Sequence, residues 1–328
     1  MRRQMLVLMM LFVILPVWVS AAPPSSAVRP VSTYSIVARD PATGELGVAV
    51  QSHWFNVGAV VPWAEAGVGA VATQSFVEVS YGPLGLELMR AGKSAPEALK
   101  SLLATDEKSD VRQVAMIDAQ GRVAAHTGEH SIAAAGHITG KNFSAQANLM
   151  EKNTVWPAMA KAFETTQGDL TDRLLAALEA AEREGGDIRG RQSAAIIVVT
   201  GKPTGVPWRD RLIDLRVEDH PHPVEELKRI VLVHRAYQHM NRGDDCVSSK
   251  DFACAEREYG AAEKLQPDNM EIVFWHAVAL ATTSRVEESL PLFRRVFAAE
   301  PRWRELVGRL PAAGQLPADV AERIRGLD

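Results

Sequence analysis

The sequence predicts an α+β protein in which two β-sheets have helices packed outside them and a small all-helical domain follows. Strand and helix patterns are mixed up to the His-Pro-His-Pro run at 220–223, without the regular βαβ alternation of a doubly wound parallel sheet. No strand pattern follows that run. Beyond it, proline and aromatic positions recur 34 residues apart, which is typical of a helical repeat.

The composition is that of an ordinary globular chain. Of 328 residues, 47% are hydrophobic and 23% are charged, which suits one large domain with a small one, or two medium domains. The net charge of −4 argues against nucleic acid and anionic membranes as partners. No cluster of His, Cys and Asp has metal-ligand spacing and no glycine-rich phosphate loop occurs, so we predict no metal or cofactor.

The first 21 residues have the features of a secretory signal peptide. Arg2 and Arg3 precede an apolar run at 5–19, and small residues up to Ala21 form a cleavage site. The run is short for a lasting membrane span, so an uncleaved anchor is the less favoured alternative. No cysteine lies near the cleavage site, so a lipid anchor is not supported. We expect a periplasmic or secreted protein without a stable membrane anchor.

Alternating apolar runs that flank turn residues predict three β-hairpins, at 33–52, 58–74 and 112–126. Two further strands follow. The continuous apolar run at 194–200 predicts a central buried strand, and the alternating run at 212–217 predicts the last one.

Four helices are predicted between these strands, at 83–91, 94–104, 150–164 and 170–184. The second has Ser94 at its start and Glu97 three residues later, which is the capping-box pattern. In the fourth, leucines and alanines form one apolar stripe, and Gly185 and Gly186 end the helix.

Thr33 is the first candidate catalytic residue. It lies at the very start of a predicted buried strand, where an N-terminal-nucleophile (Ntn) hydrolase places its catalytic hydroxyl. There the freed α-amine acts as the base for its own side chain. Threonine is also a favoured strand residue, so a structural role is the alternative.

Further candidates lie near the predicted buried strand. Asp187 and Arg189 could orient an α-amine or bind a polar substrate group, although a helix stop with a surface ion pair is the alternative. Gln192 and Ser193 favour a site, because they are polar residues that lead into a fully apolar strand. Asn148 could donate to an oxyanion, or it could cap a turn.

Several motifs of the chain occur in the same order in a bacterial family, which the chain resembles over residues 33–232. They start with Thr33-Tyr-Ser-Ile-Val-Ala-Arg-Asp and lie at 33–40, 57–74, 142–148, 185–193 and 214–223. The family is known as domain of unknown function 1028. Its placement in the Ntn-hydrolase superfamily implies a four-layer αββα sandwich over residues 33–222.

The resemblance also bears on function. Some members carry a C-terminal peptidoglycan-binding module, which suggests work on the cell wall, and no substrate is established for the family. Cytoplasmic members typically begin with Met-Thr, so that removal of Met exposes the threonine that corresponds to Thr33. The family usually has glycine where this chain has Ala147, which implies strain here if that glycine has a positive φ.

The leader complicates the exposure of Thr33. Cleavage after Ala21 leaves residues 22–32 as a linker or propeptide. Signal peptidase would cut poorly after Ser32, because Pro30 stands at the minus-three position. The alternatives are autocatalytic cleavage of the Ser32–Thr33 bond, or a Thr33 that is never freed. An acylated nitrogen cannot act as the base, so the last case predicts an inactive site.

Residues 223–328 are predicted to form a tetratricopeptide-like helical domain. Pro267 and Pro301 are 34 residues apart, and so are Tyr259 and Phe293. We expect capping helices at 223–239 and 318–326, and a generic helical appendage is the alternative. Cys246 and Cys254, the two cysteines of the chain, are equally compatible with one disulfide and with two small core residues.

Two functions follow from these features. The first is an Ntn-type amidohydrolase of the cell envelope that acts on an amide in a peptide or cell-wall fragment. The second is a non-catalytic periplasmic binding or scaffold protein that uses the αββα shell and the helical repeats to hold a protein partner. The mature N-terminus distinguishes the two.

Overall fold

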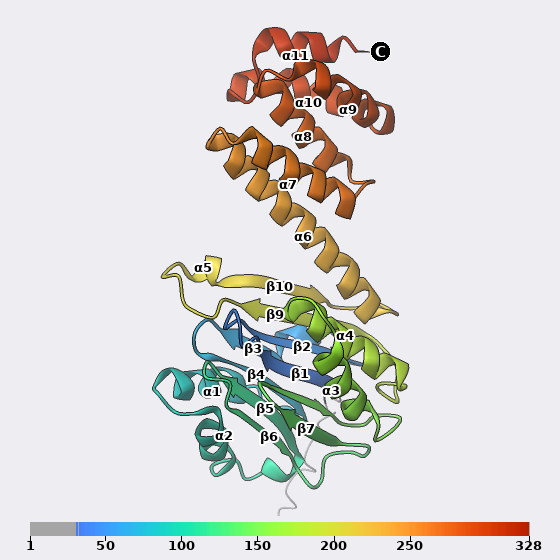
Figure 1. Cartoon of the computed structure of the whole chain (residues 1–328). Coiled ribbons are helices and arrows are strands. Elements are labelled where there is room, and N and C mark those ends of the chain that lie inside the picture. Colours follow the sequence, from blue (N-terminus) through green and yellow to red (C-terminus); the bar gives the residue numbers. More distant parts are fainter. Residues whose placement is uncertain (1–30, 32, 328) are drawn as a thin grey trace, which may run out of the picture.

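The structure is a computed structural model that describes residue 31 and residues 33–327. The predicted signal peptide (1–21) lies outside the described residues, as does the 22–32 segment apart from Val31. Two antiparallel β-sheets with flanking helices form the first part of the molecule, and a stack of helices forms the second (Figure 1).

The larger sheet has six strands in the order β10-β9-β2-β1-β8-β7. Their bounds are β1 (Thr33–Arg39), β2 (Leu46–Ser52), β7 (Gly136–Gly140), β8 (Phe143–Ala147), β9 (Ser193–Val199) and β10 (Arg211–Val217). The predicted first hairpin and the two predicted late strands are confirmed. The sequence did not predict β7 and β8, because both are five residues long and carry polar residues among apolar ones.

The smaller sheet has four strands in sequence order, β3 (Pro62–Glu65), β4 (Gly69–Ser75), β5 (Arg112–Asp118) and β6 (Val123–Thr127). The predicted hairpin at 112–126 is confirmed. The one predicted at 58–74 begins four residues later than expected, because Val57–Ala59 form a short 3₁₀-helix, η1. A second such helix, η2 (Ser109–Val111), precedes β5.

Five helices accompany the sheets: α1 (Tyr81–Arg90), α2 (Ala95–Leu103), α3 (Val155–Thr165), α4 (Leu170–Arg183) and the short α5 (Pro207–Asp210). The capping box is present, since the Glu97 amide donates to Ser94 Oγ and the Ser94 amide donates to Glu97 Oε2. Helix α3 begins five residues later than predicted, because Met150 forms a β-bridge with Asp187.

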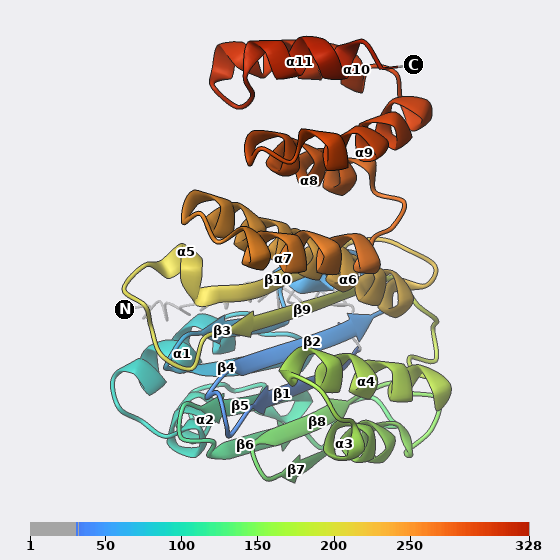
Figure 2. The ribbon, with the colours of Figure 1, turned by 45° about the horizontal axis from the view of Figure 1, so that its top comes forward.

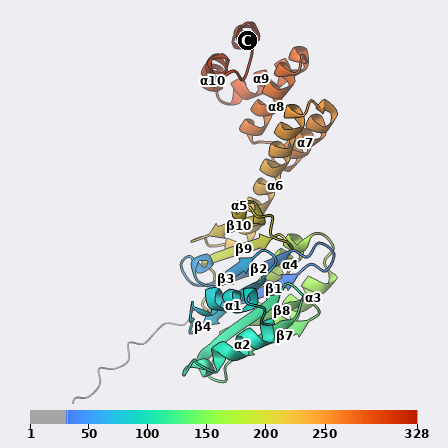
Figure 3. The same ribbon diagram turned by 90° about the vertical axis from the view of Figure 1, so that its left-hand side faces the viewer.

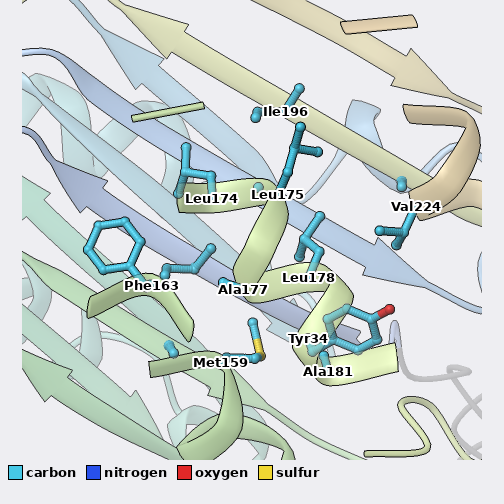
Figure 4. Close-up of a cluster of buried hydrophobic side chains, with 14 of the residues drawn as sticks. Tyr34, Met159, Phe163, Leu174, Leu175, Ala177, Leu178, Ala181, Ile196 and Val224 are labelled. Atoms are coloured by element: carbon cyan, nitrogen blue, oxygen red, sulfur yellow. The ribbon is translucent and has the colours of Figure 1, made fainter. Parts of the chain in front are cut away.

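The two sheets face each other, and the helices cover their outer faces (Figure 2). Helices α3 and α4 pack on the six-stranded sheet around Tyr34, Phe163 and Leu178 (Figure 4). Helices α1 and α2 pack on the four-stranded sheet. Between the sheets lies a separate apolar cluster, which includes Val37 and Ile117. The predicted arrangement of two sheets with helices outside is therefore the observed one.

The second part of the molecule contains only helices, stacked away from the sheets (Figure 3). They are α6 (Pro223–Ser248), α7 (Phe252–Leu265), α8 (Met270–Thr282), α9 (Val286–Ala299), α10 (Trp303–Arg309), the 3₁₀-helix η3 (Pro311–Ala313) and α11 (Ala318–Arg325). A disulfide joins Cys246, near the end of α6, to Cys254 in α7. This observation decides between the two alternatives left open by the sequence.

Helix α6 belongs to both parts of the molecule. It is nine residues longer than the predicted helix at 223–239. Its first half contributes Val224, Leu227 and Val231 to the apolar core under the six-stranded sheet. Its second half packs on α7 through Ala236 and Met240. The core of the first part therefore extends beyond residue 222.

Within residues 31 and 33–327, none of the helices combines the length and the apolar character needed to cross a membrane.

Candidate functional site

Thr33 begins a central strand and is fully buried. It pairs with Ser52 at the end of β2, and Ser52 pairs in turn with Ser193 at the start of β9. Side chains alternate along a strand, so these three residues share the face that Val37 and Val50 turn toward the other sheet. Three hydroxyl residues therefore form a row across one end of the six-stranded sheet.

The backbone of Thr33 is held from both sheets. Its carbonyl accepts hydrogen bonds from the Asn148 amide, just after β8, and from Gln74 Nε2 on β4, each at 3.1 Å. Its side-chain Oγ1 donates to the Val31 carbonyl at 2.7 Å. The position of the strand end is thereby fixed by groups that lie far apart in the sequence.

Three buried glutamines connect the sheets around Thr33. Gln74 Nε2 donates to Gln113 Oε1 on β5 at 2.7 Å, and Gln74 Oε1 accepts from Ser35 Oγ at 2.6 Å. Gln146 Nε2 on β8 donates to the same Ser35 Oγ at 2.6 Å. Asn148 Nδ2 donates to Gln113 Oε1 at 2.9 Å. The three glutamines, Ser35 and Asn148 are all fully buried.

These glutamines were not predicted from the sequence as site residues. Gln113 stands in line with Ala115 and Ile117, and Gln74 with Ala72, on the inward faces of their strands. An inward-facing glutamine within an apolar strand is the pattern that could have identified them. We refer below to Thr33, Ser35, Gln74, Gln113, Gln146 and Asn148 as the inter-sheet polar network.

Two groups beside Thr33 are buried and have no hydrogen-bond partner among the described residues. They are Ser75 Oγ and Asn148 Oδ1. Such a group costs about 1–3 kcal/mol in a folded protein. In addition, Ser75 and Leu149 have positive φ values of 71° and 57°, which non-glycine residues rarely adopt. Strain and unused polar groups gathered at one place make this end of the sheet the candidate functional site.

The predicted loop lies at the same end of the sheet. The buried Asp187 carboxylate accepts from the His53 amide at 3.1 Å, and His53 directly follows Ser52 of β2. Arg189 donates to the same carboxylate through Nε at 3.0 Å and Nη2 at 2.7 Å. The pair is thus anchored inside the structure, while the Arg189 side chain remains 28% exposed.

The remaining predicted residues, Ser193 and Gln192, make other contacts. Ser193 Oγ donates to the Trp54 carbonyl and accepts from the Val57 amide, so it holds the loop after β2. The Gln192 carbonyl accepts from the His220 amide at 2.7 Å, and its side chain is half-buried. The structure brings all six predicted residues to one end of the sheet and gives Ser193 a structural contact there.

Ala147 is not strained. The resemblance to the family implied strain at this position only if the usual glycine has a positive φ. It lies within β8, paired with Tyr34 and Gly136, and it is not among the described residues with a positive φ. Positive φ values occur instead at Asn142, just before this strand, and at Leu149, just after it.

Tyr34 marks the opposite face of the same strand end. Its hydroxyl donates to Glu182 on α4, which also forms an ion pair with Arg191. Burial, and then the Glu182 charge, raise the pKa of Tyr34 well above its usual value. Tyr34 is therefore neutral at ordinary pH and anchors α4 to the sheet (Figure 4).

Within the part of the chain that the structure describes, no group of three or more His, Cys, Asp or Glu side chains could hold a metal ion. The chemistry available at the Thr33 end is that of hydroxyl, amide, carboxylate and guanidinium groups.

Two facing antiparallel sheets with outer helices and a buried polar network at one end define the structural class of this protein. The chain belongs to a family of unknown function, DUF1028, whose model matches residues 33–227. The match ends within α6, where that helix still packs on the sheet.

A solved structure supports the same assignment. The crystal structure of protein SPO2555 from Silicibacter pomeroyi, described as DUF1028, is similar to this chain with a TM-score of 0.54 and 31% sequence identity. The similarity covers 61% of this chain and 88% of that chain. No match was found among curated proteins.

Proposed function

We propose that this protein is an N-terminal-nucleophile amidohydrolase of the bacterial cell envelope, with Thr33 as its nucleophile. One observation carries the proposal, the setting of Thr33. This residue heads a central strand, groups from both sheets hold its carbonyl, and the buried Ser75 Oγ and Asn148 Oδ1 beside it have no hydrogen-bond partner among the described residues. The layered arrangement supports the αββα sandwich of that superfamily for residues 33–222. The leader at 1–21 supports a periplasmic or secreted location.

The chemistry requires a free Thr33 α-amine. That amine takes the proton of the Thr33 hydroxyl, whose oxygen attacks the substrate amide carbon. The tetrahedral intermediate expels the substrate amine, which leaves with the proton, and an ester on Thr33 remains. Water then hydrolyses the ester and restores the hydroxyl. While its nitrogen is bonded to Ser32, Thr33 cannot act in this way.

Autocatalytic cleavage supplies the free amine. Thr33 Oγ1 attacks the carbonyl carbon of Ser32, the Ser32–Thr33 bond breaks, and the α-amine is released while an ester forms. Water then cleaves that ester, so that residues up to Ser32 leave with a new carboxylate. The same hydroxyl thus performs the processing step and the later reaction on substrate.

The neighbouring residues have distinct roles in this scheme. Asn148 Oδ1, which lacks a partner among the described residues, accepts a hydrogen bond from the freed α-amine. Arg189, held by the buried Asp187, offers a partly exposed guanidinium to a carboxylate of a peptide or cell-wall fragment. Neither a cofactor nor a metal enters the reaction.

The mature N-terminus tests the proposal. We expect mass spectrometry of protein secreted by its native host to show a chain that begins at Thr33. Thr33→Ala should block the autocatalytic cut, while Thr33→Ser keeps a hydroxyl and should permit it. An active protein that begins at Ala22 would contradict the nucleophile assignment.

A second candidate function, the binding of a protein partner, is favoured by one observation in the helical part. A cavity of about 440 Å³ lies between α6, α7 and α8. Its lining includes Asp244, Glu271 and Trp275, and none of the described residues that line it is Lys, Arg or His. The 34-residue period supports a tetratricopeptide-like repeat, and the charge favours a basic peptide segment.

Titration with a lysine-rich peptide tests this candidate. We expect binding that weakens as salt is raised and that falls in Glu271→Gln, because the cavity loses one of its two carboxylates. A glutamate-rich peptide of equal length is the control. Equal binding of the two peptides would contradict a charge-selective site.

A further inference from the structure

Val31 extends the edge of the four-stranded sheet at the Thr33 end. Strand β3 runs along β4 as far as the Pro62–Ala72 pair, and the Thr73 amide still donates to the Val61 carbonyl at 3.2 Å. Beyond this point β4 has Val31 as its neighbour. The Val31 amide donates to the Ser75 carbonyl at 2.7 Å, and the Ser75 amide donates to the Val31 carbonyl at 3.0 Å.

The Val31 side chain and carbonyl are both held in place. The side chain is 1% exposed and belongs to the apolar cluster between the sheets, which also contains Val57 and Val61. The carbonyl accepts a second hydrogen bond, from Thr33 Oγ1 at 2.7 Å. The candidate nucleophile therefore touches the residue that occupies the edge of β4.

We infer that Val31 occupies the substrate's docking position, and that the substrate is an extended peptide with a small branched apolar residue two positions before the cleaved amide. This inference rests on the proposed function. Cleavage after Ser32 frees the segment that carries Val31. An incoming peptide then forms the same two backbone hydrogen bonds with Ser75, donating one and accepting the other, and fills the same apolar space.

The physical reason is the state of Ser75 after the segment leaves. Its amide and carbonyl lose their partners at a buried position, and each such group requires a replacement. Addition of a peptide strand to a free sheet edge supplies both hydrogen bonds at once. A single amino acid or a simple amide lacks the second peptide unit, so it cannot form this bridge.

The first experiment measures hydrogen exchange at the Ser75 amide in the full chain, with Thr33→Ala keeping residue 31 in place. We expect exchange to be at least about tenfold faster when Val31→Asp is added, because a carboxylate is expelled from the apolar cluster. Val31→Ile is the matched control and should leave the rate unchanged. An unchanged rate in Val31→Asp would overturn the docking role of the apolar side chain.

The second experiment uses the full chain after processing, with dipeptide 4-nitroanilides as substrates. We expect kcat/KM for Val-Ser to exceed that for Asp-Ser by about tenfold or more, the discrimination typical of an apolar pocket. Equal rates would overturn the substrate inference and leave Thr33 as the nucleophile. A protein that begins at Ala22 and cleaves no amide would contradict the proposed function itself.

Discussion

The space between the two sheets has an apolar half and a polar half. Away from Thr33 it is filled by Val37, Val48 and Ile117. Next to Thr33 it holds the inter-sheet polar network. Burial of apolar surface stabilises the fold by about 25 cal/mol per Å², whereas the network must satisfy every polar group to avoid a loss. The apolar half provides stability, and the polar half provides a defined position for Thr33.

The largest expected effect concerns the nucleophile at the polar end. In protein produced from residue 33 after an initiator methionine, whose removal takes the place of the autocatalytic cut, Thr33→Ala should lower amide hydrolysis by at least about a thousandfold, because the attacking group is lost. Thr33→Ser is the matched control and should retain measurable activity. Steady-state kinetics on a peptide amide checks this, and wild-type rates in the alanine variant would remove Thr33 from the site.

A substitution in the apolar half should lower stability and leave activity unchanged. Ile117→Ala should lower the free energy of unfolding by about 2–5 kcal/mol, because a fully buried side chain is replaced by a cavity. Urea denaturation measures the change. Activity per folded molecule should match the wild type, and a large drop in it would show that the two halves are coupled.

A substitution at Gln113 tests the inter-sheet polar network. Gln113→Met keeps the volume but leaves Gln74 Nε2 and Asn148 Nδ2 with fewer acceptors. We expect a loss of about 1–3 kcal/mol in unfolding free energy, together with reduced activity as Asn148 shifts. Thr127→Val removes the 2.9 Å contact with Gln113 Nε2 at the edge of the network, together with a contact to His137 Nδ1, and should cost less. Equal effects would show that position in the network does not matter.

The smallest effect lies on the other face of β1. The pKa of Tyr34 is raised, so its contribution to stability is complete below pH 10 and is lost as the pH rises above the value of the unfolded chain. The stability of the Tyr34→Phe variant should therefore decline less steeply than that of the wild type between pH 9 and pH 11. Urea midpoints at the two pH values measure this, and parallel declines would contradict it.

Elements with a strong local pattern were predicted from the sequence. The β1–β2 hairpin, the Ser94 capping box, the apolar stripe of α4 and the buried strand β9 each depend on residues that are neighbours in the chain. The hairpin of β7 and β8 was missed for the opposite reason. Gln146 is polar in the sequence, and its partner Ser35 is 111 residues away.

The sequence by itself determined that Thr33 heads a buried strand and that the chain divides into a sheet part and a helical part, because alternation and helical periodicity are local properties. Only the tertiary structure decided what surrounds Thr33. Gln74 and Gln113 come from neighbouring strands of the opposite sheet, and Val31 meets Ser75 across 44 positions of the chain. These contacts depend on strand register and on how the sheets face each other, which no local pattern encodes.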